Sequence, residues 1–267
     1  MLRSPTIDCA CVLLAVAVSA SGCSGGPHHA SAGGEPLLHV SRTASFVERQ
    51  FGGDPNGFYL YTPRTRWRDI VVFVHGHGGA GEITPKYHDP WLRHLALRGS
   101  VVIYPRYEAF PGGHGAARHI VRAVRAAYDA LGPRAPNLPR IGIGYSRGGR
   151  LVVDWAAIAP QDMKPRAILS VFPGSSEDAS PNLSTIPRGT RILILVGDHD
   201  EVVGAYGAFA LVRALQQSGF GLRTVSGRIV KSTPGFTVTH LSVLASSPPA
   251  HVDFWRPADR LIASAVR

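Results

Sequence analysis

Cysteine is scarce in this sequence and is confined to one end of it. The three cysteines, Cys9, Cys11 and Cys23, all lie within the first 23 of 267 residues. The rest of the chain therefore has no disulfide bond and no thiolate metal site, because both require cysteine side chains.

Lysine is also rare, so arginine supplies almost all of the cationic charge behind a formal net charge of +10. Lysine occurs only at Lys86, Lys164 and Lys231. The arginines are scattered along the chain, without a compact basic run and without interleaved aromatic residues. This distribution argues against nucleic acid as a partner. It allows attraction to an acidic envelope surface, but without specificity.

Long hydrophobic runs are absent as well. The short apolar run near the N-terminus is typical of an export signal. Within residues 1–22, Arg3 supplies a positive charge and residues 9–20 form a short apolar stretch. That stretch is too short for a convincing membrane-spanning helix. Ala20-Ser21-Gly22-Cys23 is similar to a bacterial lipobox, although the usual leucine three residues before the cysteine is alanine here.

We therefore predict that Cys23 is lipidated and anchors an extracytoplasmic protein to the cell membrane. The alternative is cleavage after Ala20 and release as a secreted protein. Residues 23–36 have no apolar period and are predicted to form a flexible linker. Residues 37–267 are long enough for one large domain, and 45% hydrophobic with 17% charged residues is typical of globular proteins.

Strand and helix patterns alternate along this domain. Strands are predicted at 44–51, 58–62, 70–74, 101–104, 141–143, 167–172 and 192–196, with a last strand within 222–238. Helices are predicted at 89–99, 115–131, 206–217 and 249–266, and directly after residue 146 with Leu151, Trp155 and Ile158 facing inward.

Most of these strands are continuous apolar runs, which are typical of strands buried on both faces. The pattern predicts an α/β fold with a mostly parallel central sheet and helices on both faces. Only about twenty residues separate the strands at 167–172 and 192–196. That spacing leaves no room for a cap domain.

The segment Gly144-Tyr145-Ser146-Arg147-Gly148 follows an apolar strand and precedes a helix. This is the context in which Gly-x-Ser-x-Gly acts as a nucleophile elbow. The turn is too tight for side chains on its flanks, so Gly144 and Gly148 serve by lacking a β-carbon. Ser146 is predicted to be a nucleophile, and the Arg147 N–H an oxyanion donor.

A serine nucleophile needs a base and an orienting carboxylate, which on such a fold come later in the chain. After the strand at 192–196, we favour Asp200 as the acid, with Asp198 as the second choice. For the base we favour His240, where strand passes into loop. His251 is the alternative, although the pattern places it inside the terminal helix. The glycine-rich loop after Val74 makes the His77 N–H the second oxyanion donor.

Together, the strand and loop at 70–79, the elbow, the acid loop at 197–203 and a late histidine resemble the α/β-hydrolase superfamily. Segments 72–76, 102–105 and 254–255 look like compact bacterial esterases and lipase-like enzymes without a lid. The resemblance implies the α/β-hydrolase fold, a Ser146–His240–Asp200 triad and oxyanion donors at His77 and Arg147. It also implies an acyl-enzyme reaction on small-molecule or lipid esters, with no cofactor.

Two other functions remain open at this point. His75-x-His77, directly after a strand, could ligate zinc in a metal-dependent hydrolase, but this leaves the elbow unexplained. The chain could also be a surface lipoprotein that keeps the fold only for binding, since a fold does not establish activity.

Overall fold

The computed structural model describes residues 34–267 except 54, 78–83, 109–114 and 176–179. The predicted export signal and Cys23 lie outside the described residues, as does nearly all of the predicted linker. Among the helices that are described, none has the length and apolar character needed to cross a membrane.

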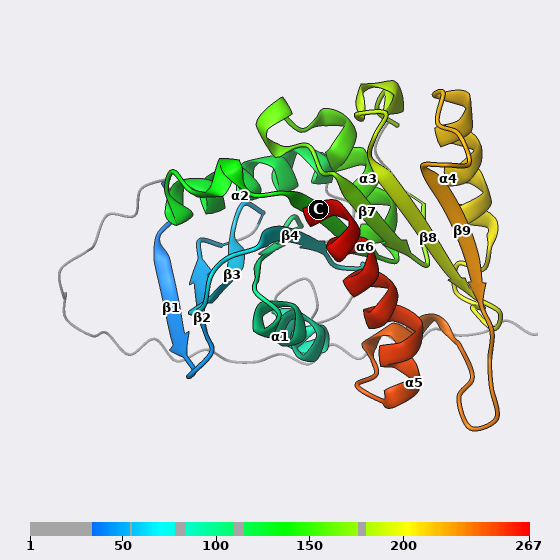
Figure 1. The fold of residues 1–267 in the computed structure, drawn as a ribbon, viewed down its shortest axis with the longest axis horizontal. Coiled ribbons are helices and arrows are strands. Elements are labelled where there is room, and N and C mark those ends of the chain that lie inside the picture. Colours follow the sequence, from blue (N-terminus) through cyan, green and yellow to red (C-terminus); the bar gives the residue numbers. More distant parts are fainter. Residues whose placement is uncertain (1–33, 54, 78–83, 109–114, 176–179) are drawn as a thin grey trace, which may run out of the picture. The chain divides into compact units, whose positions relative to one another are not determined.

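The described chain forms one nine-stranded sheet in the order β1-β2-β3-β5-β4-β6-β7-β8-β9 (Figure 1). The strands are β1 (Leu37–Arg42), β2 (Phe46–Phe51), β3 (Phe58–Pro63), β4 (Asp69–Val74), β5 (Ser100–Pro105), β6 (Arg140–Tyr145), β7 (Ala167–Val171), β8 (Arg191–Gly197) and β9 (Val225–Val230). The pairings from β1 to β5 are antiparallel, and all pairings from β5 through β4 to β9 are parallel. The mostly parallel sheet is therefore confirmed.

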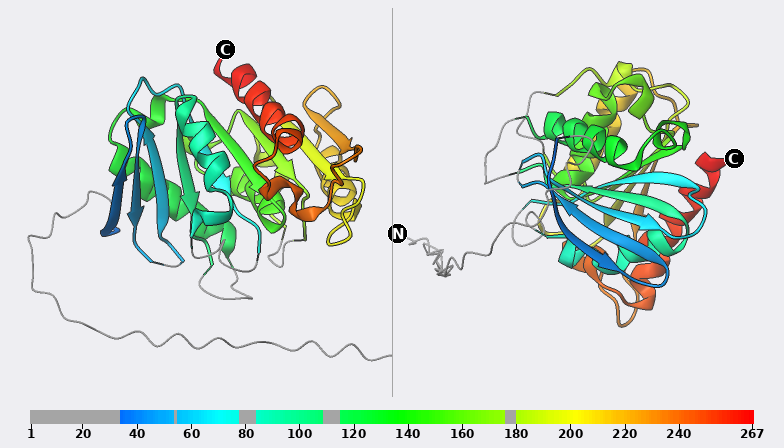
Figure 2. Two further views of the ribbon diagram at one scale, coloured as in Figure 1. Left: turned by 90° about the horizontal axis from the view of Figure 1, so that it is seen from below. Right: turned by 90° about the vertical axis from the view of Figure 1, so that its left-hand side faces the viewer.

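Helices cover both faces of this sheet (Figure 2). They are α1 (Asp89–Leu97), α2 (Ala116–Leu131), α3 (Arg147–Ile158), α4 (Tyr206–Gln217), α5 (Pro248–Ala250) and α6 (Arg256–Val266). Helices α2, α3 and α4 lie on one face, and α1 and α6 lie on the other. Strands β4 and β5 are buried along their whole length, as expected for apolar runs covered on both sides.

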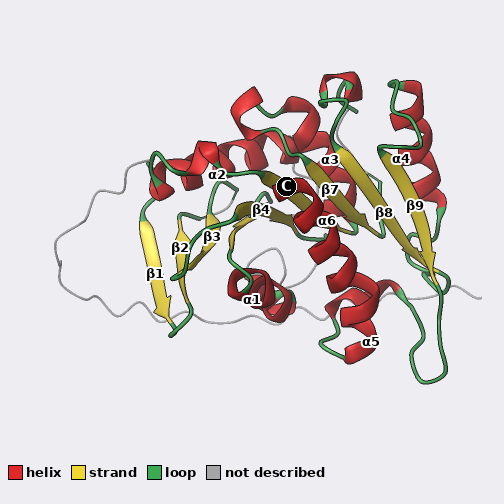
Figure 3. Cartoon of the chain, viewed as in Figure 1, coloured by secondary structure: helices red, strands yellow, loops and turns green. Residues whose placement is uncertain are grey.

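The structure differs from the sequence-based expectation in three places. Strand β1 was not predicted, and it pairs only with β2 at the edge of the sheet. Ile158, predicted to face inward, is 39% exposed because α3 ends there. The predicted terminal helical segment is continuous, but a π-helical turn, His251–Trp255, joins α5 to α6 within it. Figure 3 shows the helices in red and the strands in yellow.

The segment between β7 and β8 bears on access to the sheet edge. Its described residues contain a single 3-10 helix, Leu183–Thr185, and no cap domain. The carboxyl ends of the parallel strands, where α/β proteins place their ligands, are therefore not covered by a separate domain in the described part of the chain.

Candidate active site

Ser146 sits on a strained turn between β6 and α3. Its φ of 57° and ψ of −126° place it in a region that non-glycine residues seldom occupy. A β-carbon on Gly144 would collide with the main chain of Gly148, and one on Gly148 would collide with the carbonyl oxygens of Val74 and His75. Glycine is thus required on both sides of the elbow by direct main-chain contact.

Hydrogen bonds hold the elbow in this strained conformation. The Ser146 N–H donates to the Val171 oxygen at 2.9 Å, and the Ser146 carbonyl accepts from Gly149 at 2.8 Å and Gly174 at 3.0 Å. Because these partners lie in α3 and at the end of β7, the turn is fixed from two directions. Such strain is typical of functional sites where the surrounding structure over-determines the backbone.

The structure brings Ser146, His240 and Asp200 into one hydrogen-bonded chain. His240 Nε2 lies 2.9 Å from Ser146 Oγ, and His240 Nδ1 lies 2.9 Å from Asp200 Oδ2. The side chain of His240 is 7% exposed and that of Asp200 is fully buried. A serine, an imidazole and a carboxylate at these separations match the geometry required for nucleophilic catalysis by serine.

The second carboxylate oxygen of Asp200 is also occupied. Oδ1 accepts the N–H groups of Val202 at 2.9 Å and Val203 at 3.1 Å. These two bonds fix the plane of the carboxylate, so Oδ2 is held toward the imidazole.

Aromatic residues that the sequence did not single out surround His240. The Tyr145 hydroxyl donates to the His240 carbonyl at 3.0 Å, and the rings of Tyr145 and Phe172 lie 5.1 and 5.6 Å from the imidazole. Burial raises the pKa of Tyr145, so its hydroxyl stays a donor. Phe172 has a φ of 49° at the end of β7, a second strained residue next to the elbow.

The two alternative residues lie elsewhere. Asp198 accepts hydrogen bonds from Ser232 and His199, and the Ser232 bond is the main cause that lowers the pKa of Asp198. It thus secures the segment after β9. His251 stacks on Trp255 with ring centroids 3.7 Å apart, within the π-helical turn.

The two histidines after β4 have different environments. His75 is fully buried, its Nδ1 contacts the Gly76 oxygen at 2.7 Å, and its ring stacks between Tyr104 and Tyr107. Burial lowers the pKa of His75 to about 4, so its ring is neutral at pH 7. His77 is 42% exposed and its Nδ1 faces Glu108 Oε2 at 3.2 Å. No group of three or more ligating side chains that could hold a metal ion occurs among the described residues.

Glu108 was not predicted, yet its carboxylate joins two segments of the site. It is fully buried, and it forms an ion pair with Arg147, whose side chain is 7% exposed, while its other oxygen faces His77. Glu108 follows β5, whereas His77 follows β4 and Arg147 follows β6. An acidic residue shortly after an apolar strand was the signal that could have revealed it, because carboxyl ends of parallel strands share one edge.

The main chain at His77 and Arg147 lies close to Ser146. A β-carbon on Gly76 would lie 3.0 Å from Ser146 Cβ, so the loop after β4 passes directly beside the elbow. Arg147 is the first residue of α3, so its N–H has no acceptor within the helix. Both N–H groups therefore belong to segments that border the serine.

No protein-family model matches the sequence, and no curated protein matches it. Solved structures do match. An α/β-hydrolase from a deep-sea metagenome library of the Medee basin is 12% identical, with a TM-score of 0.58 over 84% of this chain and 99% of its own. An esterase of Pyrobaculum calidifontis is 18% identical, with a TM-score of 0.58 over 87% of each chain. Esterase 2 of Thermogutta terrifontis is 17% identical, with a TM-score of 0.57 over 84% of this chain and 96% of its own.

At these identities the likeness concerns the fold and not the activity. The matches cover 84–87% of this chain, which includes most of the described sheet and its helices. The chain therefore has the α/β-hydrolase fold.

Proposed function

We propose that the protein is a serine hydrolase that cleaves carboxylic esters through an acyl-enzyme. The observation that carries this proposal is the chain of two 2.9 Å contacts from Ser146 Oγ through His240 to Asp200. This series of contacts begins at Ser146 on the strained elbow. It lies at the carboxyl edge of the sheet, which no separate domain covers in the described residues.

In the first step, His240 Nε2 takes the proton of Ser146 Oγ while that oxygen forms a bond to the ester carbonyl carbon. The negative charge that develops on the carbonyl oxygen is stabilised by the N–H groups of His77 and Arg147. His240 then gives its proton to the leaving alcohol, and an acyl-serine remains. Asp200 keeps Nδ1 as the donor and stabilises the imidazolium without taking its proton.

In the second step, water replaces the alcohol. His240 takes a proton from the water as its oxygen attacks the acyl carbon, and returns it to Ser146 Oγ when the acid leaves. These two reaction steps require no cofactor. The structural neighbours support ester substrates, because two of them are esterases and that of Thermogutta terrifontis is phosphoramylated by tabun.

The test is covalent labelling together with turnover. The wild-type chain should react with a fluorophosphonate probe and hydrolyse p-nitrophenyl esters, and Ser146→Ala should lose both with its melting temperature retained. Ser175→Ala, which changes an exposed serine on the segment after β7, is the matched control. A folded wild-type chain that neither reacts nor turns over would instead favour a catalytically inactive binding protein.

We also propose that Cys23 carries a lipid that holds the enzyme on the outer side of the cell membrane, where small-molecule or lipid esters are its substrates. Cys23→Ser should move the protein from the membrane fraction to the soluble fraction after expression in a bacterial host. Equal fractionation of the two chains would favour plain secretion or another anchor.

A further inference from the structure

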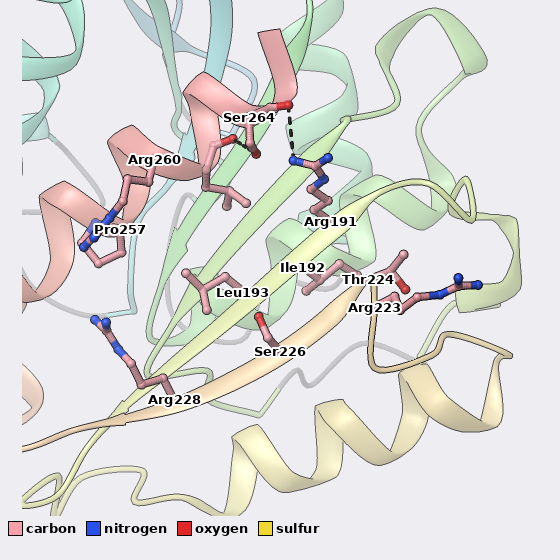
Figure 4. Close-up of a pocket in the computed structure, with 11 residues that line it drawn as sticks. Arg191, Ile192, Leu193, Arg223, Thr224, Ser226, Arg228, Pro257, Arg260 and Ser264 are labelled. Carbon is pink, nitrogen blue, oxygen red and sulfur yellow. Dashed lines mark hydrogen bonds between the residues drawn. The ribbon is translucent and has the colours of Figure 1, made fainter. Parts of the chain in front are cut away.

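A cavity of about 370 Å³ lies between β8, β9 and α6 (Figure 4). Its lining contains four arginines, three hydroxyl side chains and four apolar side chains: Arg191, Arg223, Arg228, Arg260, Thr224, Ser226, Ser264, Ile192, Leu193, Pro257 and Leu261. No carboxylate is among them. A concave site that combines apolar walls with a few converging polar groups is typical of ligand pockets.

The cavity shares no residue with the proposed active site. It is lined by the first residues of β8, whereas Asp200 follows the carboxyl end of the same strand. The lining includes none of Ser146, Asp200 and His240. The cavity is therefore not part of the pocket in which the ester would be cleaved.

Several arginines elsewhere in the described chain are paired with a carboxylate. Arg93, Arg98, Arg125, Arg147 and Arg150 each form an ion pair with an aspartate or glutamate. Arg191 and Arg228 instead donate to main-chain oxygens, those of Ser264 and Asp253. The Asp253 carboxylate is close enough to Arg228 to interact with its charge, but no carboxylate lines the cavity itself. A bound anion would relieve the positive potential of the four guanidinium groups.

A neighbouring cavity of about 400 Å³ is lined by cations whose hydrogen bonds stabilise the fold. There, Lys164 donates to the carbonyls of Ala156 and Ala157 at the end of α3, and Arg166 donates to Ala265 at the end of α6. These cations satisfy helix C-termini, as Arg191 also does through Ser264 near the end of α6. Arg260 has no such partner among the described residues, and in Figure 4 its guanidinium lies at the same end of the cavity as that of Arg228.

We propose that this cavity binds a phosphate ester, with the phosphate between Arg228 and Arg260 and the organic portion against Leu193 and Leu261. The planar guanidinium groups can each donate two hydrogen bonds to phosphate oxygens. Ser226 on β9 adds a hydroxyl donor. Such an ester has two sources, a lipid headgroup or a soluble metabolite, and they differ in the length of the apolar portion.

The test is titration calorimetry of the full chain at low ionic strength with three probes. They are dihexanoyl phosphatidylglycerol, glycerol 3-phosphate and dihexanoyl phosphatidylcholine, whose headgroup has no net charge. We expect binding of one or both anionic probes, weakened about tenfold or more in the Arg228→Gln, Arg260→Gln double variant. Binding should also weaken at high salt, where exposed charges are screened.

The matched control is Arg64→Gln, Arg213→Gln, which removes the same charge from exposed arginines outside the cavity. This variant should bind as the wild type does, and both double variants should retain the wild-type melting temperature. Tighter binding of phosphatidylglycerol than of glycerol 3-phosphate would assign the site to a lipid headgroup, and equal binding would assign it to a soluble ester. Absence of binding, equal binding of phosphatidylcholine, or equal losses in both double variants would overturn the proposal.

Discussion

Replacing Asp200 with asparagine tests how the carboxylate controls His240. Oδ1 of Asp200 accepts two main-chain N–H groups, and Oδ2 faces His240 Nδ1 at 2.9 Å. An amide has one accepting oxygen and one NH₂ group that cannot accept. Turning the NH₂ group toward Val202 and Val203 would leave two donors without an acceptor, at about 1–3 kcal/mol each.

The asparagine oxygen therefore takes the position of Oδ1, and its NH₂ group faces His240 Nδ1. Nδ1 must then be the acceptor, so the ring proton moves to Nε2, which lies 2.9 Å from Ser146 Oγ. A protonated Nε2 cannot take the serine proton. We expect kcat to fall about 10⁴-fold, or about 5 kcal/mol of transition-state stabilisation, as expected for a wrong tautomer.

The assay is steady-state hydrolysis of p-nitrophenyl butyrate, with the thermal melting temperature measured in parallel. KM and melting temperature should change little, because the amide keeps the shape of the carboxylate and both main-chain hydrogen bonds. Asp198→Asn is the matched control, since that carboxylate lies two residues away and holds Ser232 instead. A loss below tenfold in a folded Asp200→Asn chain, or an equal loss in the control, would refute the reasoning.

Two further predictions concern the buried charges and histidines. Glu108→Gln leaves the buried Arg147 guanidinium without its counter-ion, so urea unfolding should show a loss of about 3–5 kcal/mol; a loss below 1 kcal/mol would contradict a buried ion pair. Burial also lowers the pKa of His75 to about 4 and that of His88 to about 3. Both pKa values lie below the value of about 6.5 for histidine in the unfolded chain, so the unfolded chain takes up protons at a higher pH than the folded chain. The stability that is fully present above pH 6.5 is therefore lost as the pH falls toward the two folded-state pKa values. Each histidine should lower the free energy of unfolding by about 2 kcal/mol between pH 7.5 and 5. His88→Phe should remove about half of the combined pH dependence. Equal free energies of unfolding of the wild type at the two pH values would argue against this reasoning.

The elements of the fold were predictable because their signals are local. Apolar runs such as 70–74 and 192–196 correspond to β4 and β8, and the amphipathic pattern of 206–217 corresponds to α4. Strand β1 was missed because its side chains are mostly exposed and carry no apolar run. The π-helical turn His251–Trp255 also leaves no sequence pattern of its own.

The sequence identified some residues of the candidate site more specifically than others. Ser146 could be named from five consecutive residues, because the glycines on its flanks report a steric requirement of the turn itself. Asp200 and His240 could only be assigned to segments at the sheet edge, with Asp198 and His251 as the alternatives. Their selection rests on contacts that span 40 and 94 residues of sequence, which local patterns do not specify.

The amino-acid sequence alone determined the order of strands and helices other than β1, together with the turn at Ser146 that requires glycine on both flanks, since these follow from side-chain periodicity and backbone sterics. The tertiary structure decided which imidazole meets the serine, that Glu108 joins two loops, and that four scattered arginines line one cavity. The physical reason is that charge and hydrogen-bond partners are chosen by distance in space, and packing the sheet sets those distances.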